Sequence, residues 1–208
     1  MLEDWHDEDE FDPIEGYCMR CRESVEIESP MPVWTRKGLP ATRGECPICG
    51  GTVFRMGKTY QHDERNRPEA VQIGDDNKRN RPKLARDTVY VTYADDDEEI
   101  AQQIAGDLEK VGIAVWLHDH GDNNTKWASG VHPALIECAR MVYVLSANAI
   151  DNASVVNAWM FFKEQRKPIV IAQVERIDPP DLIRRSPRFD FRSDYKPAFR
   201  QMLDALNQ

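Results

Sequence analysis

Residues 88–93 read Thr-Val-Tyr-Val-Thr-Tyr, and Ala-Asp-Asp-Asp-Glu-Glu follows directly at 94–99. The first segment is rich in β-branched and aromatic residues, which predicts a buried strand. The acidic segment predicts the beginning of a helix, because a helix N-terminus favours side-chain caps and negative charge. Gly112 is expected to end this helix. Its apolar positions at helical spacing are Ile100, Ile104, Leu108 and Val111.

The alternation of strand and helix continues toward the C-terminus. Further strands are expected at 113–117, 141–146, 169–174 and 189–191. Further helices are expected to include residues 131–138, 155–164 and 199–206. Strict alternation implies a parallel sheet covered by helices on both faces, so the predicted fold class is α/β.

Four of the five cysteines form two Cys-x-x-Cys pairs, and Cys138 stands alone. Four thiolates around one tetrahedral ion suit a structural Zn²⁺, which predicts a small β zinc ribbon. A redox dithiol is the alternative. A site with four protein ligands has no open position, so we expect no catalysis by this metal. The predicted ligands are Cys18, Cys21, Cys46 and Cys49, and Cys138 is expected to be a small buried apolar residue.

Composition divides the chain into four parts. Residues 1–16 hold eight acids and no Lys or Arg, so this acidic arm carries most of the formal net charge of −9. Residues 17–57 form the ribbon, residues 58–86 a polar and basic linker, and residues 87–208 the α/β domain. Because the rest of the chain is near neutral, its charge gives no general argument for nucleic-acid binding.

No segment suggests a membrane span or a secretory signal. The longest apolar runs have fewer than ten residues, whereas a membrane helix needs about twenty. The first residues are acidic, where a signal peptide is basic and then apolar. We therefore expect a cytoplasmic protein with no membrane partner.

Several segments after residue 87 resemble, in order, those of TIR (Toll/interleukin-1 receptor) domains. They are Val89–Asp97, Val115–Leu117, Gly121–Trp127, Met141–Ser146 and Lys167–Ile171. The resemblance implies a flavodoxin-like fold with a five-stranded parallel sheet. A phosphoacceptor receiver domain is the competing α/β fold. It would need an aspartate after the third strand, where this chain has Ser-Ala-Asn at 146–148.

The ribbon segment also resembles a small bacterial zinc-ribbon family. The matching stretches are Gly38-Leu-Pro-Ala at 38–41 and Gly-Glu-Cys-Pro-Ile-Cys-Gly at 44–50. This resemblance implies the fold and the zinc but not the partner, which is a protein or a nucleic acid.

The TIR resemblance implies a specific chemistry. Many bacterial and plant members cleave NAD⁺ at the nicotinamide–ribose bond, through an oxocarbenium-like state as in glycoside hydrolysis. The family's catalytic Glu lies nine residues before the Lys of Lys-Pro, and that position is Ala158 here. Three explanations are open: an engineered Glu-to-Ala change, a naturally inactive scaffold, or another carboxylate that serves instead.

The resemblance also suggests a substrate-binding set. Tyr93 and Ala94 follow the first strand, where open α/β sheets place ligands. Asp119 and Trp127 flank the loop expected over the nucleotide, and Ser154 lies one helical turn before position 158. A packing role is the alternative for Tyr93. The histidines at 118, 120 and 132 are expected to be exposed loop residues rather than a second metal site.

Two functions follow from the resemblance. The first is an NAD⁺ hydrolase or cyclase that is activated by self-association, as in prokaryotic antiviral defence, and that this chain carries in an inactive form. The second is a non-catalytic scaffold in which both domains bind protein.

Overall fold

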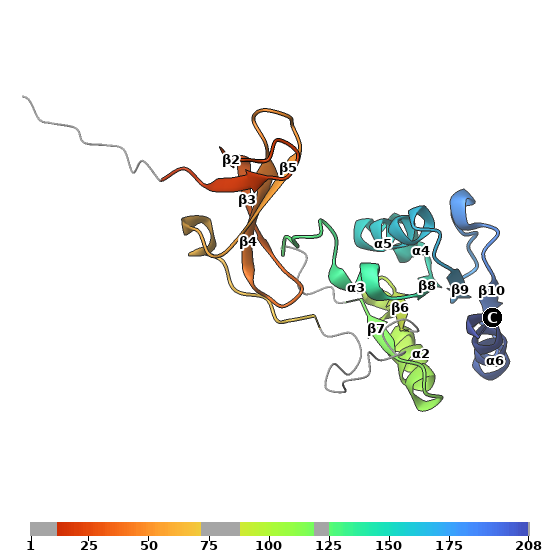
Figure 1. Ribbon diagram of the computed structural model, residues 1–208. Helices are drawn as coiled ribbons and strands as arrows, with labels where there is room; N and C mark the ends of the chain where they lie inside the picture. Colours follow the sequence, from red (N-terminus) through yellow and green to blue (C-terminus); the bar gives the residue numbers. More distant parts are fainter. Residues whose placement is uncertain (1–11, 72–87, 119–124, 208) are drawn as a thin grey trace, which may run out of the picture. The chain divides into compact units, whose positions relative to one another are not determined.

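The computed structural model describes residues 12–71, 88–118 and 125–207 (Figure 1). These residues form two compact units. The N-terminal unit comprises the described residues of Met1–Val71 and Asn124–Val131. The C-terminal unit comprises those of Gln72–Asn123 and His132–Gln208.

The C-terminal unit is built on a five-stranded sheet in the order β10-β9-β8-β6-β7. All neighbouring strands run parallel, as the alternation of strands and helices predicts. The prediction of a flavodoxin-like α/β sheet is confirmed. The strands are β6 (Val89–Thr92), β7 (Val115–Leu117), β8 (Arg140–Leu145), β9 (Ile169–Gln173) and β10 (Arg188–Asp190).

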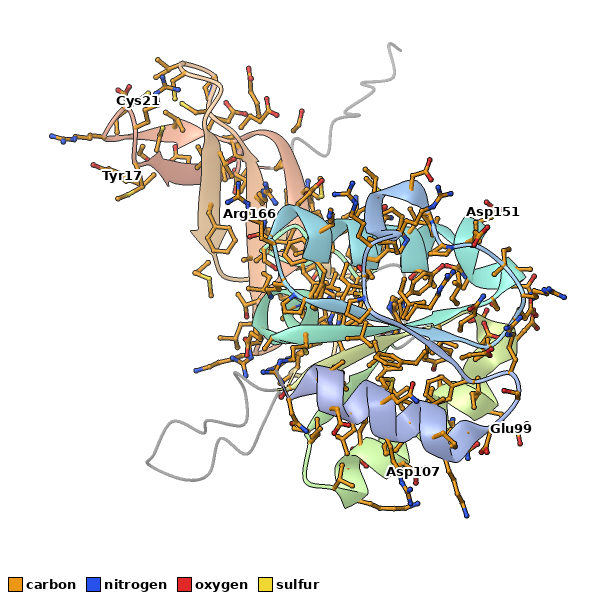
Figure 2. The ribbon with its side chains drawn as sticks, turned by 90° about the vertical axis from the view of Figure 1, so that its right-hand side faces the viewer. Tyr17, Cys21, Glu99, Asp107, Asp151 and Arg166 are labelled. Carbon is orange, nitrogen blue, oxygen red and sulfur yellow. The ribbon has the colours of Figure 1, made fainter. Side chains whose placement is uncertain are left out.

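Helices cover both faces of this sheet. Figure 2 shows α4 and α5 on one face and α2 and α6 on the other. The helices are α2 (Glu98–Lys110), α3 (Pro133–Glu137), α4 (Ala147–Asp151), α5 (Ala153–Glu164) and α6 (Tyr195–Leu206), with single 3₁₀ turns η2 (Asp95–Asp97) and η3 (Asp181–Ile183). None of the helices in the described ranges is long and apolar enough to cross a membrane.

The pleat of β6 separates the two cores. Val89, Val91 and Tyr93 pack into the apolar cluster with α2 and α6. Because successive side chains of a strand point to opposite faces, Tyr90 and Thr92 face the α5 side. The ring contact between Tyr90 and Phe162 of α5, with centroids 6.0 Å apart, agrees with this assignment.

The N-terminal unit contains two small antiparallel sheets. The first is two-stranded, and the second has the order β3-β4-β5. Residues 52–56 form a strand, and Val25 and Ile27, which alternate with glutamates, are both buried. The strands are β1 (Glu15–Cys18), β2 (Glu23–Glu26), β3 (Glu28–Trp34), β4 (Pro40–Glu45) and β5 (Thr52–Met56).

Residues 58–71, whose polar composition suggests a linker, pack with the ribbon. A 3₁₀ turn, η1 (Tyr60–His62), brings the His62 ring into the unit, where only 2% of the residue is exposed. Its Nε2 lies 3.0 Å from the carbonyl oxygen of Ala41. The Arg36 guanidinium donates to the carbonyl oxygen of Val71 over 3.0 Å. The bonds of His62, of the Arg36 side chain and of the Val71 amide to the Arg36 carbonyl therefore hold a polar segment that has no apolar periodicity.

The tightest glycine of the described chain predicts a local stability effect. A Cβ at Gly44 would lie 2.3 Å from Ile27 Cγ2 and 2.4 Å from the Glu28 carbonyl oxygen. We expect Gly44→Ala to lower the free energy of unfolding by about 1–3 kcal/mol, as overpacking does. The control is Gly106→Ala in α2, which meets nothing within 4 Å and should raise it by up to about 1 kcal/mol. Scanning calorimetry on both variants checks this, and equal effects would contradict the packing described.

Candidate functional site

The four cysteines predicted as metal ligands come together at the N-terminal unit. Their sulfur atoms all lie within 4.8 Å of one another, and Figure 2 shows Cys21 where these atoms gather. The Cys18–Cys49 and Cys21–Cys46 sulfur pairs are 3.7 and 3.9 Å apart. A tetrahedron with metal–sulfur bonds of about 2.3 Å has edges of about 3.8 Å. The donor set and its spacing therefore fit a tetrahedral ion, and the distances are too long for disulfides.

The cysteines are also part of the ribbon's small core. Cys18 and Cys46 are buried with Ile14, Val25, Ile27 and Val53, and the other two cysteines pack at its edge. The amide of Cys21 donates to the Cys18 sulfur over 3.4 Å. This bond is the main reason that the pKa of Cys18 is lowered to about 7, which favours the thiolate that binds a metal. An ion bound here would contribute folding free energy to a unit that buries few apolar side chains.

Position 158 lies on the buried face of α5. Ser154, Ala158 and Phe162 are spaced four residues apart, so they follow one another along one side of the helix. Only 1% of Ala158 is exposed. Tyr90 of β6 contacts the Phe162 ring and is linked through His118 to Ser154. Tyr90 therefore faces the stretch of helix that contains position 158.

The imidazole of His118 joins the sheet to the first turn of α5. Its Nδ1 lies 2.7 Å from the Tyr90 hydroxyl, and its Nε2 lies 2.6 Å from Ser154 Oγ. The expectation that His118 is an exposed loop residue is wrong: it follows β7 directly, is half-buried and uses both ring nitrogens. His132 caps α3, with Nδ1 accepting from the Ala134 amide, and His120 lies outside the described residues.

Two hydroxyls on the same face of the sheet have no hydrogen-bond partner within the described residues. They are Thr92 Oγ1 and the Tyr143 hydroxyl, on residues that pair directly across β6 and β8. Both residues are fully buried, and burial raises the pKa of the Tyr143 hydroxyl. Buried polar atoms without a protein partner commonly bind water or a ligand group. This face of the sheet, which α5 covers, therefore offers two buried hydroxyl groups to a water molecule or a ligand group.

The acidic residues after β6 accept hydrogen bonds from residues that follow β8. Asp97 accepts a hydrogen bond from the Ser146 hydroxyl, and Asp96 accepts one from the Asn148 amide. Burial raises the pKa of Asp97. The predicted negative first turn is present, but no side chain of η2 or α2 caps its own helix. These carboxylates instead link the β6–α2 junction to the β8–α4 junction.

The other residues of the predicted substrate-binding set are described one by one. Tyr93 packs in the α2–α6 core, on the opposite face of the sheet, and Ala94 is buried after it. Trp127 belongs to the N-terminal unit, where it forms a parallel bridge with Trp34. Asp119 lies outside the described residues. Cys138 is fully buried, as predicted, and burial raises its pKa to about 12.

The fold and the buried face of α5 define the C-terminal unit as a flavodoxin-like α/β domain with a candidate site between helix and sheet. The sequence profile of the TIR domain family matches residues 89–203, more than half of the chain. The chain therefore belongs to the TIR domain family. The profile of a domain of unknown function, DUF5679, matches residues 17–56.

Solved structures include a similar domain. The crystal structure of the TIR domain of the Toll-related receptor TRR-2 from Hydra magnipapillata aligns with 18% sequence identity and a TM-score of 0.47. The alignment covers 58% of this chain and 98% of that one. No curated protein matches this chain.

The cysteine cluster predicts metal-dependent stability of the N-terminal unit. We expect one ion per chain by elemental analysis, and its loss in Cys46→Ser because one of four thiolates is missing. Acidification should release the ion, since the ligands must be deprotonated to bind. The control is Cys138→Ala, which removes the cysteine outside the cluster and should keep the full metal content. Equal metal content in both variants, or none in the unchanged protein, would contradict a four-cysteine site.

Proposed function

We propose that this TIR domain is of the NAD⁺-cleaving type and that Ala158 occupies its catalytic position. The chain as it stands would then act by binding and self-association, without cleaving NAD⁺. The buried methyl group of Ala158, between Ser154 and Phe162 on α5, is the observation that carries this proposal. The position corresponds to the catalytic Glu in the resemblance to NAD⁺-cleaving members.

The chemistry explains why this one residue matters. When the nicotinamide–ribose bond breaks, the nicotinamide leaves as a neutral molecule and positive charge develops on the ribose. A carboxylate beside the ribose stabilises that charge, and such electrostatic groups typically contribute about 10²–10³-fold to a rate. A methyl group cannot hold a ribose hydroxyl or stabilise a cation. The only carboxylate of α5 is Glu164, which is exposed and lies six residues further along the helix.

The surroundings of position 158 support a carboxylate there. A buried carboxylate is strongly destabilised unless it accepts hydrogen bonds. The Ser154 hydroxyl lies one turn away on the same helix face and is bonded to His118. The hydroxyls of Thr92 and Tyr143 lie on the facing side of the sheet and have no hydrogen-bond partner among the described residues. The hydroxyls of Thr92 and Tyr143 are donors available to a carboxylate side chain or to the oxygens of a bound ligand.

The N-terminal unit fits a zinc ribbon that binds a partner. Four thiolates with tetrahedral spacing suit Zn²⁺, which would be structural because no ligand position stays open. The resemblance to assembly-activated TIR proteins suggests that this unit senses a trigger, protein or nucleic acid, and that the TIR domain self-associates in response. A role in prokaryotic antiviral defence follows from the same resemblance.

A scaffold function is the second candidate, and the alanine itself favours it. A domain that lacks the catalytic carboxylate retains the surfaces of the fold and can assemble with itself or with other proteins. The two candidates differ in what a restored carboxylate would do.

The decisive variant is Ala158→Glu. We expect it to release nicotinamide from NAD⁺ at least about 10²-fold faster than the unchanged chain, because the carboxylate stabilises the developing cation. Chromatography of the products, at high protein concentration and with a crowding agent to favour assembly, measures the rate and separates linear from cyclic ADP-ribose.

Two controls isolate the carboxylate at this position. Ala158→Gln places an amide of the same shape at the site and should stay inactive. Met160→Glu places a carboxylate on the exposed side of α5 and should stay inactive as well, since 38% of Met160 is exposed. Nicotinamide release by the unchanged chain would show that another group is catalytic. Inactivity of Ala158→Glu under all these conditions would favour the scaffold.

A further inference from the structure

Three hydrogen-bonding side chains form a series from the buried sheet to the partly exposed start of α5. Tyr90, of which 2% is exposed, lies within hydrogen-bond distance of His118, and His118 lies within hydrogen-bond distance of Ser154. His118 and Ser154 are both half-buried. One end of this series is thus the hydroxyl of the half-buried Ser154, and the other end is a phenol fixed in the core.

This order of groups matches the general arrangement of an activated nucleophile. Such a site needs a hydroxyl within reach of a base, and a third group that orients the base. A neutral imidazole donates from one ring nitrogen and accepts at the other. When Nδ1–H of His118 donates to the Tyr90 oxygen, Nε2 accepts the hydroxyl proton of Ser154. The distances of 2.7 and 2.6 Å allow both bonds at once.

The position of Ser154 adds a second effect. Ser154 is the second residue of α5, a helix of 12 residues whose N-cap is Asn152. The positive end of the helix dipole stabilises negative charge within the first turn. An alkoxide developing on Ser154 would benefit from this field.

We propose that Ser154 is a nucleophile activated by His118, with Tyr90 as the residue that positions the imidazole. Its substrates are electrophilic acyl or phosphonyl compounds, such as carboxylic esters. This activity is separate from NAD⁺ cleavage and requires no side chain at position 158 beyond the alanine present.

The reaction balances with the groups at hand. Ser154 Oγ attacks the ester carbonyl carbon and forms an acyl–oxygen bond, while its proton passes to His118 Nε2. The ester carbon–oxygen bond breaks, and the leaving alkoxide takes that proton to become an alcohol. Water then attacks the acyl-serine, gives its proton to Nε2 and releases the carboxylic acid, and Ser154 recovers its proton.

The structure also limits the rate. The third group is a phenol, which stabilises an imidazolium less than a carboxylate does. The amides of Ser154 and Val155 already donate to Asn152 Oδ1 over 3.0 and 3.2 Å, so they do not serve an oxyanion directly. General-base assistance typically gives 10²–10⁴-fold, and we expect the lower end, about 10²-fold. Covalent labelling is therefore a better readout than turnover.

The test is reaction of the unchanged full chain with a fluorophosphonate probe, followed by mass spectrometry of the modified peptide. We expect stoichiometric labelling of Ser154, abolished in Ser154→Ala and about 10²-fold slower in His118→Gln. Tyr90→Phe should slow labelling less, because it removes the orienting bond and leaves the base in place. The matched control is Ser129→Ala, which removes an exposed serine that bonds the Val131 carbonyl and should leave labelling of Ser154 unchanged.

A second measurement does not depend on any variant folding correctly. Labelling of the unchanged chain should slow as the solution is acidified, because a protonated imidazole cannot accept the serine proton. Labelling of Ser154 no faster than that of Ser129 would overturn the proposal, and so would a rate that is independent of both pH and His118. Neither result bears on NAD⁺ cleavage by Ala158→Glu.

Discussion

The contact between Tyr90 of β6 and Phe162 of α5 determines which side of α5 faces the sheet. The ring centroids lie 6.0 Å apart, and residues three or four positions from Phe162 lie on the same side of the helix. Ala158 and Ser154 then follow at successive turns of that side. The hydrogen bonds through His118 hold the first of these turns to the end of the neighbouring strand β7. A parallel sheet needs both faces covered, so the same packing that completes the core also forms the candidate site.

Much of the fold follows from local sequence patterns. Runs of β-branched residues predict the buried strands, and the helical spacing of apolar residues predicts α2. Strands and helices that alternate and connect by right-handed crossovers can form only a few topologies. The short helix α4 escapes this reasoning, because its five residues show no full helical repeat. The folding of residues 58–71 escapes it as well. In that segment, His62 contacts the carbonyl oxygen of Ala41, and the carbonyl oxygen of Val71 accepts a bond from Arg36. Composition does not predict such contacts between residues far apart in the sequence.

The two candidate sites differ in how far sequence predicts them. The clustering of the four cysteines is predicted in full, because two Cys-x-x-Cys pairs have the residue type and spacing that are typical of a tetrahedral metal site. Around position 158, Ser154 and Ala158 are placed by helical spacing, but His118 comes from a strand end more than thirty residues earlier in the chain. A histidine in a loop is expected to be exposed, and this is the expectation for His118. Its contacts with Tyr90 and Ser154 explain why it is half-buried instead. For Tyr93, the sequence leaves a ligand contact and a packing role open, and the pleat turns its side chain toward the core with α2 and α6.

We infer that the Ala158 methyl group faces Tyr90, whose hydroxyl lies within hydrogen-bond distance of His118. Nuclear Overhauser spectroscopy on a chain with labelled alanine methyl groups and aromatic rings tests it most directly. The account predicts cross-peaks from the Tyr90 ring to the rings of Phe162 and His118, and from the Ala158 methyl to Tyr90. Cross-peaks from the Ala158 methyl to residues of α2 or α6, with none to Tyr90, would contradict it.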